Sequence, residues 1–117
     1  MAAKRWQQAV LKSTQMDSKI LLGKILQKFK DQGFSKYADY NSFGYLAEDN
    51  NSITVSRENG DDTKIPFAKI LIAIEAYKHD SNLYGEGPSV LREFGITHIT
   101  SPIFSMTHLL SKNEYER

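Results

Sequence analysis

The fold is decided by residues 52–79, which read SITVSRENGDDTKIPFAKILIAIEAYKH. The first five of these residues alternate polar and apolar side chains and include β-branched types, which favours a strand with one buried face. Asn59-Gly60 can adopt the positive φ angles of a tight turn, and a second extended run ends at Pro66, which cannot donate to a sheet. The stretch predicts a β-hairpin with strands near residues 52–57 and 62–66.

A buried central helix is predicted directly after the hairpin, over residues 67–79. Apolar side chains recur there at intervals of three and four residues, which is the spacing of one helix face. A helix that is apolar over much of its circumference packs against several other elements. The side chains concerned are Phe67, Ile70, Leu71, Ile74 and Tyr77, with Ile72 and Ala73 beside them.

Two helices are predicted before the hairpin. Residues 2–13 consist largely of good helix formers, and Ala3, Trp6 and Val10 fall on one face, opposite several basic residues. This pattern predicts a short basic amphipathic helix. Its apolar face is too small to favour attachment to a membrane surface.

The second helix is predicted to begin at a capping box, Thr14-Gln15-Met16-Asp17, in which the Thr14 hydroxyl accepts from the first turn and the Asp17 carboxylate favours the helix start. It is predicted to stop at Gly33. An apolar stripe made by Leu21, Leu22, Ile25, Leu26 and Phe29 runs along it. Phe34 is expected to pack back on the helix, and Gly23 is expected to mark a close approach by another backbone.

Residues 35–50 contain three tyrosines and are predicted to form a loop anchored to the core by its aromatic rings. The last third of the chain predicts a pair of helices. Gly87-Pro88 begins the first, which Gly95 ends, and Ser101-Pro102 begins the second with Ser101 as its cap. Residues from Asn113 onward are expected to fray. Together these elements predict a single domain over residues 1–117, α+β and mostly helical.

Charge is distributed unevenly along a chain whose net charge is only +1. Residues 1–38 hold eight basic and two acidic residues, a net charge of +6, whereas residues 39–117 hold seven basic and twelve acidic residues, a net charge of −5. A strongly basic segment suits an anionic partner such as nucleic acid. The same asymmetry is compatible with a well-solvated helix surface, or with two copies that pack through opposite charges.

The leading functional hypothesis from the sequence is a small non-enzymatic nucleic-acid-associated protein. The C-terminal pair of helices has the outline of a DNA-binding helix-turn-helix. The connection is long, however, and none of the Arg, Lys, Asn and Gln side chains that read bases lies between residues 93 and 111. Phosphate contacts are then expected from the N-terminal helices, and groove contacts from the C-terminal pair. The candidate residues are Lys4, Arg5, Lys12, Lys24 and Lys28 for phosphates, and Thr97, His98 and Ser105 for the groove.

Two other functions stay open. One is a protein-interaction module or a homo-oligomer, with a homodimer or a protein partner and no nucleic acid, in which acidic and basic surfaces meet. The weaker alternative is a metal-dependent nuclease, because Asp49 and the Asp62-Thr63-Lys64 triplet flank the predicted hairpin, and such enzymes hold Mg²⁺ on carboxylates beside a lysine.

The cysteine and histidine content and the lengths of the apolar runs exclude several kinds of reaction and site. The chain has no cysteine, which excludes thiolate catalysis and disulfides, and its three histidines show no metal-ligand spacing. No cofactor and no metal is therefore predicted. No apolar run approaches the roughly 20 residues that span a bilayer, and no secretory signal is recognised at the N-terminus, so we expect no membrane partner and a cytoplasmic location.

Overall fold

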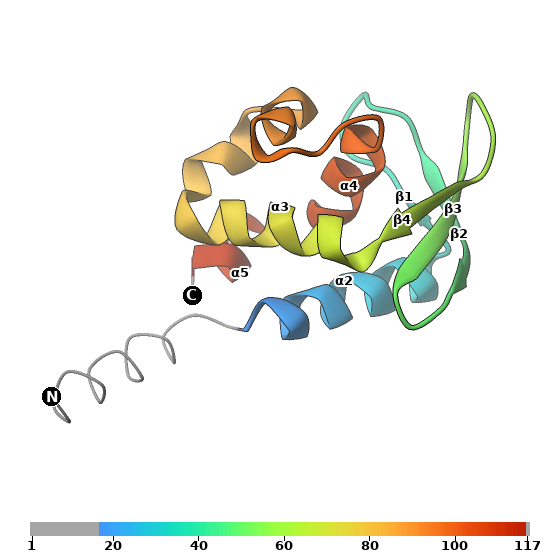
Figure 1. The fold of residues 1–117 in the computed structure, drawn as a ribbon, viewed down its shortest axis with the longest axis horizontal. Helices are drawn as coiled ribbons and strands as arrows, with labels where there is room; N and C mark the ends of the chain where they lie inside the picture. Colours follow the sequence, from blue (N-terminus) through green and yellow to red (C-terminus); the bar gives the residue numbers. More distant parts are fainter. Residues whose placement is uncertain (1–16, 117) are drawn as a thin grey trace, which may run out of the picture.

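A computed structural model describes residues 17–116 of this protein as an α+β fold with one four-stranded antiparallel sheet (Figure 1). The strands lie in the order β1-β2-β3-β4, so each pairs with its neighbour in the sequence. The strands are β1 (Phe34–Ser35), β2 (Phe43–Glu48), β3 (Ser52–Arg57) and β4 (Thr63–Pro66). The α-helices are α2 (Ser18–Gln32), α3 (Phe67–His79), α4 (Thr100–Thr107) and α5 (Lys112–Glu116), and the 3₁₀ helices are η1 (Ser81–Gly85) and η2 (Pro88–Phe94).

The predicted hairpin is confirmed as β3 and β4, which pair with Ile53 opposite Ile65. Pro66 ends β4, where its missing N–H is not needed, and the chain passes straight into α3. The sheet is nevertheless larger than the single predicted hairpin, because residues 35–50, which were predicted to form a loop, contain β2 and the second residue of β1. An irregularity between Tyr45 and Ala47 shifts the register of β2 against β3 and interrupts the two-residue alternation that identifies strands.

The central helix α3 has the predicted bounds and carries much of the core. It lies between α2 on one side and η2 on the other (Figure 1). Its fully buried side chains meet apolar residues from the inner stripe of α2, from the sheet and from α4. The buried residues of α3 are Ile70, Ala73, Ile74, Ala76 and Tyr77.

Helix α2 confirms the second of the two predicted N-terminal helices, whereas the first, over residues 2–13, lies outside the described residues. Helix α2 begins at Ser18, so its cap is Asp17 and not Thr14 as predicted; the Asp17 carboxylate accepts from the Lys19 N–H at 2.7 Å. Gly33 ends the helix with φ 85°, as predicted. Phe34 does not pack back, since its side chain is 49% exposed, and a Cβ at Gly23 would meet no atom within 4 Å.

The C-terminal region differs from its prediction in two places. The element from Pro88 to Gly95 is present but is a 3₁₀ helix, and α4 begins at Thr100 after Ile99, so Ser101 is not its cap. The expected fraying from Asn113 is wrong, because the chain forms α5. The Tyr115 ring is fully buried there and its hydroxyl donates to the carbonyl oxygen of Thr107.

Candidate functional site

The predicted phosphate-binding residues fall into two groups. Lys24 and Lys28 lie on the outer side of α2, and Lys24 Nζ forms an ion pair with Glu114 Oε1 at 3.0 Å. Part of the predicted basic surface is therefore neutralised by α5. The other three, Lys4, Arg5 and Lys12, lie outside the described residues.

The predicted groove-contact residues do not form one surface. Thr97 and His98 are exposed on the connection between η2 and α4, where His98 has a positive φ of 65°. Ser105 is only 1% exposed, and its Oγ lies 2.6 Å from the Oγ of Ser35 in β1. The expected groove contact from Ser105 is wrong, because this residue belongs to the buried side of α4. The connection also lies across α3 from α2 in Figure 1, so Thr97 and His98 do not lie beside Lys24 and Lys28.

Two of the residues proposed for the nuclease alternative, Asp49 and Lys64, lie together. Lys64 Nζ lies 3.3 Å from Asp49 Oδ2 at the surface of the sheet. Asp49 holds the turn between β2 and β3, since its Oδ1 accepts from the backbone N–H groups of Asn51 and Ser52. The Asn51 hydrogen bond in particular, with help from Ser52 and Lys64, lowers the Asp49 pKa to about 2. Among residues 17–116 no group of three or more histidine or carboxylate side chains could hold a metal ion.

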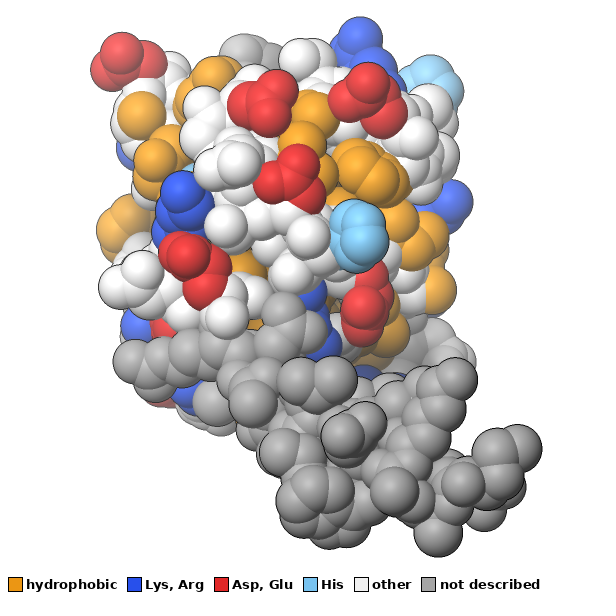
Figure 2. Space-filling view, turned by 90° about the vertical axis from the view of Figure 1, so that its left-hand side faces the viewer, with side chains coloured by type: hydrophobic (Ala, Val, Ile, Leu, Met, Phe, Trp, Pro, Cys, Tyr) orange, Lys and Arg blue, Asp and Glu red, His pale blue; other side chains and the backbone are white. Residues whose placement is uncertain are grey.

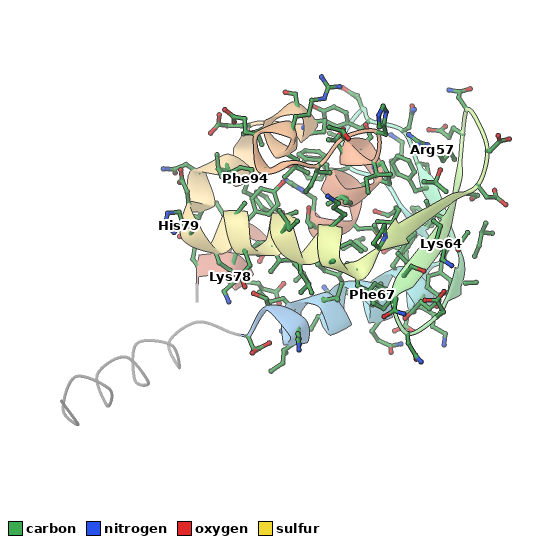
Figure 3. All side chains as sticks on the ribbon, in the orientation of Figure 1. Arg57, Lys64, Phe67, Lys78, His79 and Phe94 are labelled. Atoms are coloured by element: carbon green, nitrogen blue, oxygen red, sulfur yellow. The ribbon has the colours of Figure 1, made fainter. Side chains whose placement is uncertain are left out.

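A different feature stands out on the surface: an open apolar groove of about 460 Å³ between α3 and the end of η2. Phe94 forms one wall, and its side chain is 40% exposed. Figure 3 shows Phe94 reaching from η2 towards the second half of α3, with His79 at the end of that helix. The α3 residues of the floor and rim are Ala68, Leu71, Ile72, Glu75, Ala76 and His79.

Backbone geometry holds Phe94 over the groove. Gly87 has φ 85° immediately before η2, and Gly95 has φ 84° immediately after it, so two glycines set the direction in which η2 enters and leaves. Lys69 Nζ donates to the Gly95 carbonyl oxygen at 3.4 Å and joins the end of η2 to the first turns of α3. The wall of the groove is therefore attached at the residue that follows Phe94.

The groove lies on an acidic part of the surface. Residues 75–93 contain the acidic residues Glu75, Asp80, Glu86 and Glu93 against only two basic residues. One of those two, Lys78, has a side chain only 13% exposed; its Nζ forms an ion pair with Glu75 Oε1 at 4.0 Å and donates to Ser18 Oγ at 3.0 Å. Figure 2 looks onto this end of the molecule and shows acidic side chains around apolar ones. The groove thus combines an apolar floor with a negatively charged surround.

Sequence reasoning missed this groove because it placed Leu71 and Ile72 on the buried part of the central helix. The sequence did show that the apolar face of α3 is broad. In the structure this face is wider than the part that neighbouring elements cover. Leu71 and Ile72 are only partly buried in consequence. A pattern in one helix cannot show which part of a broad apolar face stays open, since this depends on the positions of the neighbouring elements.

No family of known proteins matches this sequence, and comparison with curated proteins and with solved structures finds no similar chain. The candidate site therefore has to be interpreted from its own geometry and charge.

None of the helices within residues 17–116 is long and apolar enough to cross a membrane.

Proposed function

We propose that this protein is a protein-interaction module whose α3 groove binds an amphipathic, basic helix. The observation that carries the proposal is the open apolar groove beside Phe94, set in an acidic surface. Large apolar side chains left exposed together in a concave surface are typical of interaction sites. This choice favours the second of the functions that the sequence left open.

The shape of the groove suits a helix. The α3 residues that line it lie at intervals of three and four positions from Ala68 to His79, so they form one straight strip. At 1.5 Å per residue this strip is about 17 Å long, the length of a helix of three turns. Ala68 and Ala76 are small, which lets a second helix approach α3 closely, while Phe94 supplies an aromatic anchor.

The charge of the surface selects a basic partner. The Glu75 side chain is 64% exposed at the groove, where its Oε1 is already paired with Lys78 and accepts from Ser18, so Oε2 is the oxygen left for a partner. Asp80, Glu86 and Glu93 extend the acidic surface along η1 and η2. Lysine and arginine on the flanks of a docked helix would meet these carboxylates, and complementary charge increases the rate and the selectivity of association.

The test uses a synthetic helical peptide with apolar residues at i, i+3, i+4 and i+7 and lysines elsewhere. We expect saturable binding to the full chain by fluorescence anisotropy of a labelled peptide. We also expect affinity at least about 10-fold lower for the version with glutamates in place of lysines. The variant Ala68→Arg, which fills the exposed floor with a cation, should abolish binding. Ala47→Arg makes the same change on the exposed part of β2 and should have no effect.

Binding that is equal for the lysine and glutamate peptides, or unchanged in Ala68→Arg, would overturn the proposal. If the protein instead sediments as a dimer and Ala68→Arg abolishes dimerisation, the groove would bind a second copy of the chain. The nucleic-acid hypothesis stays a prediction, supported by the eight basic residues among residues 1–38.

A further inference from the structure

We propose that Asn59 is a site of spontaneous deamidation, in which its side-chain amide is converted into a carboxylate, and that it reacts before any other asparagine of the folded chain. The site lies in the loop between β3 and β4 and is independent of the α3 groove. The proposal rests on one difference between the asparagines, namely the state of the backbone N–H that follows each of them.

Deamidation requires a free backbone nitrogen next to the asparagine, which is why asparagines are among the chemically labile residues of proteins. The nitrogen of the following residue attacks the side-chain carbonyl carbon, Cγ, and loses its proton to solvent, while ammonia leaves and a succinimide ring forms. Water then opens the ring. Breaking the Cγ–N bond leaves aspartate, and breaking the bond from the main-chain carbonyl carbon to the same nitrogen leaves isoaspartate. In sum, one amide and one water become one carboxylate and one ammonium ion.

Both reacting groups are free in the loop between β3 and β4. Residues 58–62 are all exposed and lie outside the strands, and Figure 1 shows this loop projecting beyond the sheet. Among the hydrogen bonds of residues 17–116, none is formed by the Asn59 amide or by the Gly60 N–H. Gly60 also has no Cβ that could obstruct the approach of its nitrogen to Cγ.

Hydrogen bonds hold the two ends of this loop but not its middle. Glu58 Oε2 accepts from the Ser42 N–H at 2.6 Å, and Thr63 Oγ1 donates to the Asp61 carbonyl oxygen at 3.1 Å. Arg57 Nη1 lies 3.4 Å from the same threonine oxygen, at the base of the loop. The reaction can therefore take place without any opening of the sheet.

The other five asparagines are exposed as well, so exposure does not distinguish them from Asn59. In each of them, however, the following N–H donates a hydrogen bond. Attack on Cγ then requires that this hydrogen bond break first, which slows the reaction. These asparagines are Asn41, Asn50, Asn51, Asn82 and Asn113.

Two carboxylates protect three of these asparagines. Asp49 Oδ1 accepts from the N–H groups of Asn51 and Ser52, which follow Asn50 and Asn51, at 2.8 and 2.9 Å. The Ser42 N–H, which follows Asn41, is the one that Glu58 binds.

Backbone carbonyl oxygens protect the remaining two. The Leu83 N–H, after Asn82, donates to the Asp80 carbonyl oxygen at 3.1 Å. The Glu114 N–H, after Asn113, donates to the Ser111 carbonyl oxygen at 3.1 Å. Among the six asparagines, Asn59 is thus the one whose following N–H has no acceptor within the described residues.

The modification changes the charge of an acidic loop. Residues 58–62 contain the carboxylates of Glu58, Asp61 and Asp62 and no basic residue, so deamidation adds a fourth negative charge. The isoaspartate product also lengthens the main chain by one carbon beside Glu58. Because the ammonia is lost to solvent, the change is not reversed and accumulates with the age of the molecule.

The test follows the full chain during incubation at neutral pH. Trypsin cleaves after Arg57 and Lys64, so residues 58–64 form a peptide in which Asn59 is the only asparagine. We expect this peptide to gain the mass that corresponds to replacement of an NH₂ group by OH. It should appear as two products of equal mass, aspartate and isoaspartate, which chromatography separates. The peptide of residues 37–57, with three asparagines, should react several-fold more slowly.

Unfolding in urea separates the effect of the structure from that of the sequence. In the unfolded chain the backbone N–H groups lose their intramolecular acceptors, so the rates at the five other asparagines should rise several-fold. Asn59 should react at nearly its folded rate. A rate at Asn59 that rises on unfolding as much as the others would overturn the proposal, since the folded loop would then protect this residue too.

Asp49→Ala tests the protecting hydrogen bonds directly. It frees the N–H groups that follow Asn50 and Asn51 and should raise deamidation at both several-fold, with Asn59 as an unchanged internal reference. The matched control Lys64→Ala removes the ion pair with Asp49 but keeps the two backbone hydrogen bonds, so it should change neither rate. Equal rates in Asp49→Ala and in the unchanged chain would contradict the role given to these hydrogen bonds.

Gly60→Ala tests the attacking group. A Cβ at this position obstructs the approach of the nitrogen, so deamidation of Asn59 should slow several-fold. Because the φ of Gly60 is 113°, this change also strains the loop, and Asn59→Gln provides a second test without such strain. Glutamine needs a larger ring and should stay amidated over the same period. Loss of the amide at an unchanged rate in either variant would overturn the proposed mechanism.

Discussion

The imidazole of His108 stacks on the ring of Tyr84, with the two centroids 3.9 Å apart, and its Nε2 lies 2.7 Å from the carbonyl oxygen of the same tyrosine. Its Nδ1 lies 2.8 Å from the Phe104 carbonyl oxygen. A neutral imidazole can donate through only one nitrogen, whereas the cation could donate to both carbonyls. Burial among the rings of Tyr37, Tyr77, Tyr84 and Phe104 opposes the cation. Burial dominates and lowers the pKa of His108, although both carbonyl contacts act to raise it.

Stability should therefore rise with pH near neutrality. In the unfolded chain a histidine takes up its proton near a pKa of about 6.5, while folded His108 resists protonation. The stability that depends on neutral His108 is fully present above about pH 6.5 and is lost progressively as the pH falls from there towards the lower pKa of folded His108. We expect the thermal unfolding midpoint to increase between pH 5.5 and 7.5, and His108→Gln to flatten that increase.

The control is His79→Gln, which alters an exposed ring and should leave the pH slope unchanged. Asp49 and Glu114, whose pKa values are lowered, affect stability only at more acidic pH. A midpoint that rises as the pH falls from 7.5 to 5.5 would show that folded His108 favours the cation, contrary to our prediction.

Tyr115 should anchor the C-terminus. Its ring is fully buried and its hydroxyl donates to the Thr107 carbonyl oxygen. Tyr115→Ala should reduce the free energy of unfolding in urea by about 3–5 kcal/mol, the usual cost of removing a large buried aromatic ring. Tyr115→Phe keeps the ring and should cost only about 1 kcal/mol. A loss below about 1 kcal/mol in Tyr115→Ala would mean that α5 contributes little to the fold.

Ser35 and Ser105 should be energetically coupled, because their buried hydroxyls lie 2.6 Å apart and join β1 to α4. Each single change to alanine leaves one buried hydroxyl without its partner and should cost about 1–3 kcal/mol. The double variant should cost less than the sum of the two single changes, which a double-mutant cycle in urea would measure. Strict additivity would argue against the hydrogen bond.

Phe94 should contribute to partner binding more than to stability. Phe94→Ala removes the exposed wall of the groove and should weaken the lysine peptide at least about 10-fold, or about 1.4 kcal/mol, in fluorescence anisotropy. The matched control is Phe34→Ala, since Phe34 is another exposed phenylalanine and lies away from the groove in β1. Equal losses of affinity in the two variants would show that Phe94 has no specific role in binding the peptide.

The nucleic-acid hypothesis predicts a different ligand, DNA, which would bind at the N-terminal helices. If the basic N-terminal helices bind phosphates, random-sequence duplex DNA should quench Trp6 with an affinity that falls steeply as salt is added. The double change Lys24→Glu and Lys28→Glu should abolish that quenching, whereas the control Lys64→Glu on β4 should preserve it. Quenching that is insensitive to salt, or that persists in the double variant, would count against a phosphate-binding surface on α2.

Local sequence patterns were sufficient to predict the elements in which those patterns are strong. The spacing of apolar residues fixed the bounds of α3, alternation with Asn59-Gly60 gave β3 and β4, and Gly33 and Gly95 marked the ends of their helices as expected. These features depend on backbone conformation and on one-sided burial, which neighbouring residues in the chain determine.

Long-range packing decided the rest. β2 has a weak pattern of its own and becomes a strand because β3 pairs with it, and α5 is ordered because Tyr115 finds a buried site far from it in the sequence. Ser105 looked available for a ligand in the sequence but is buried against Ser35, seventy positions earlier. The groove likewise exists only because η2 covers part of α3 and leaves Leu71 and Ile72 partly open. The sequence by itself determined that α2 and α3 are helical, that β3 and β4 are extended and which of their faces are apolar, since these follow from local spacing. Only the tertiary structure decided which apolar faces are covered, because that depends on how elements distant in the chain pack together.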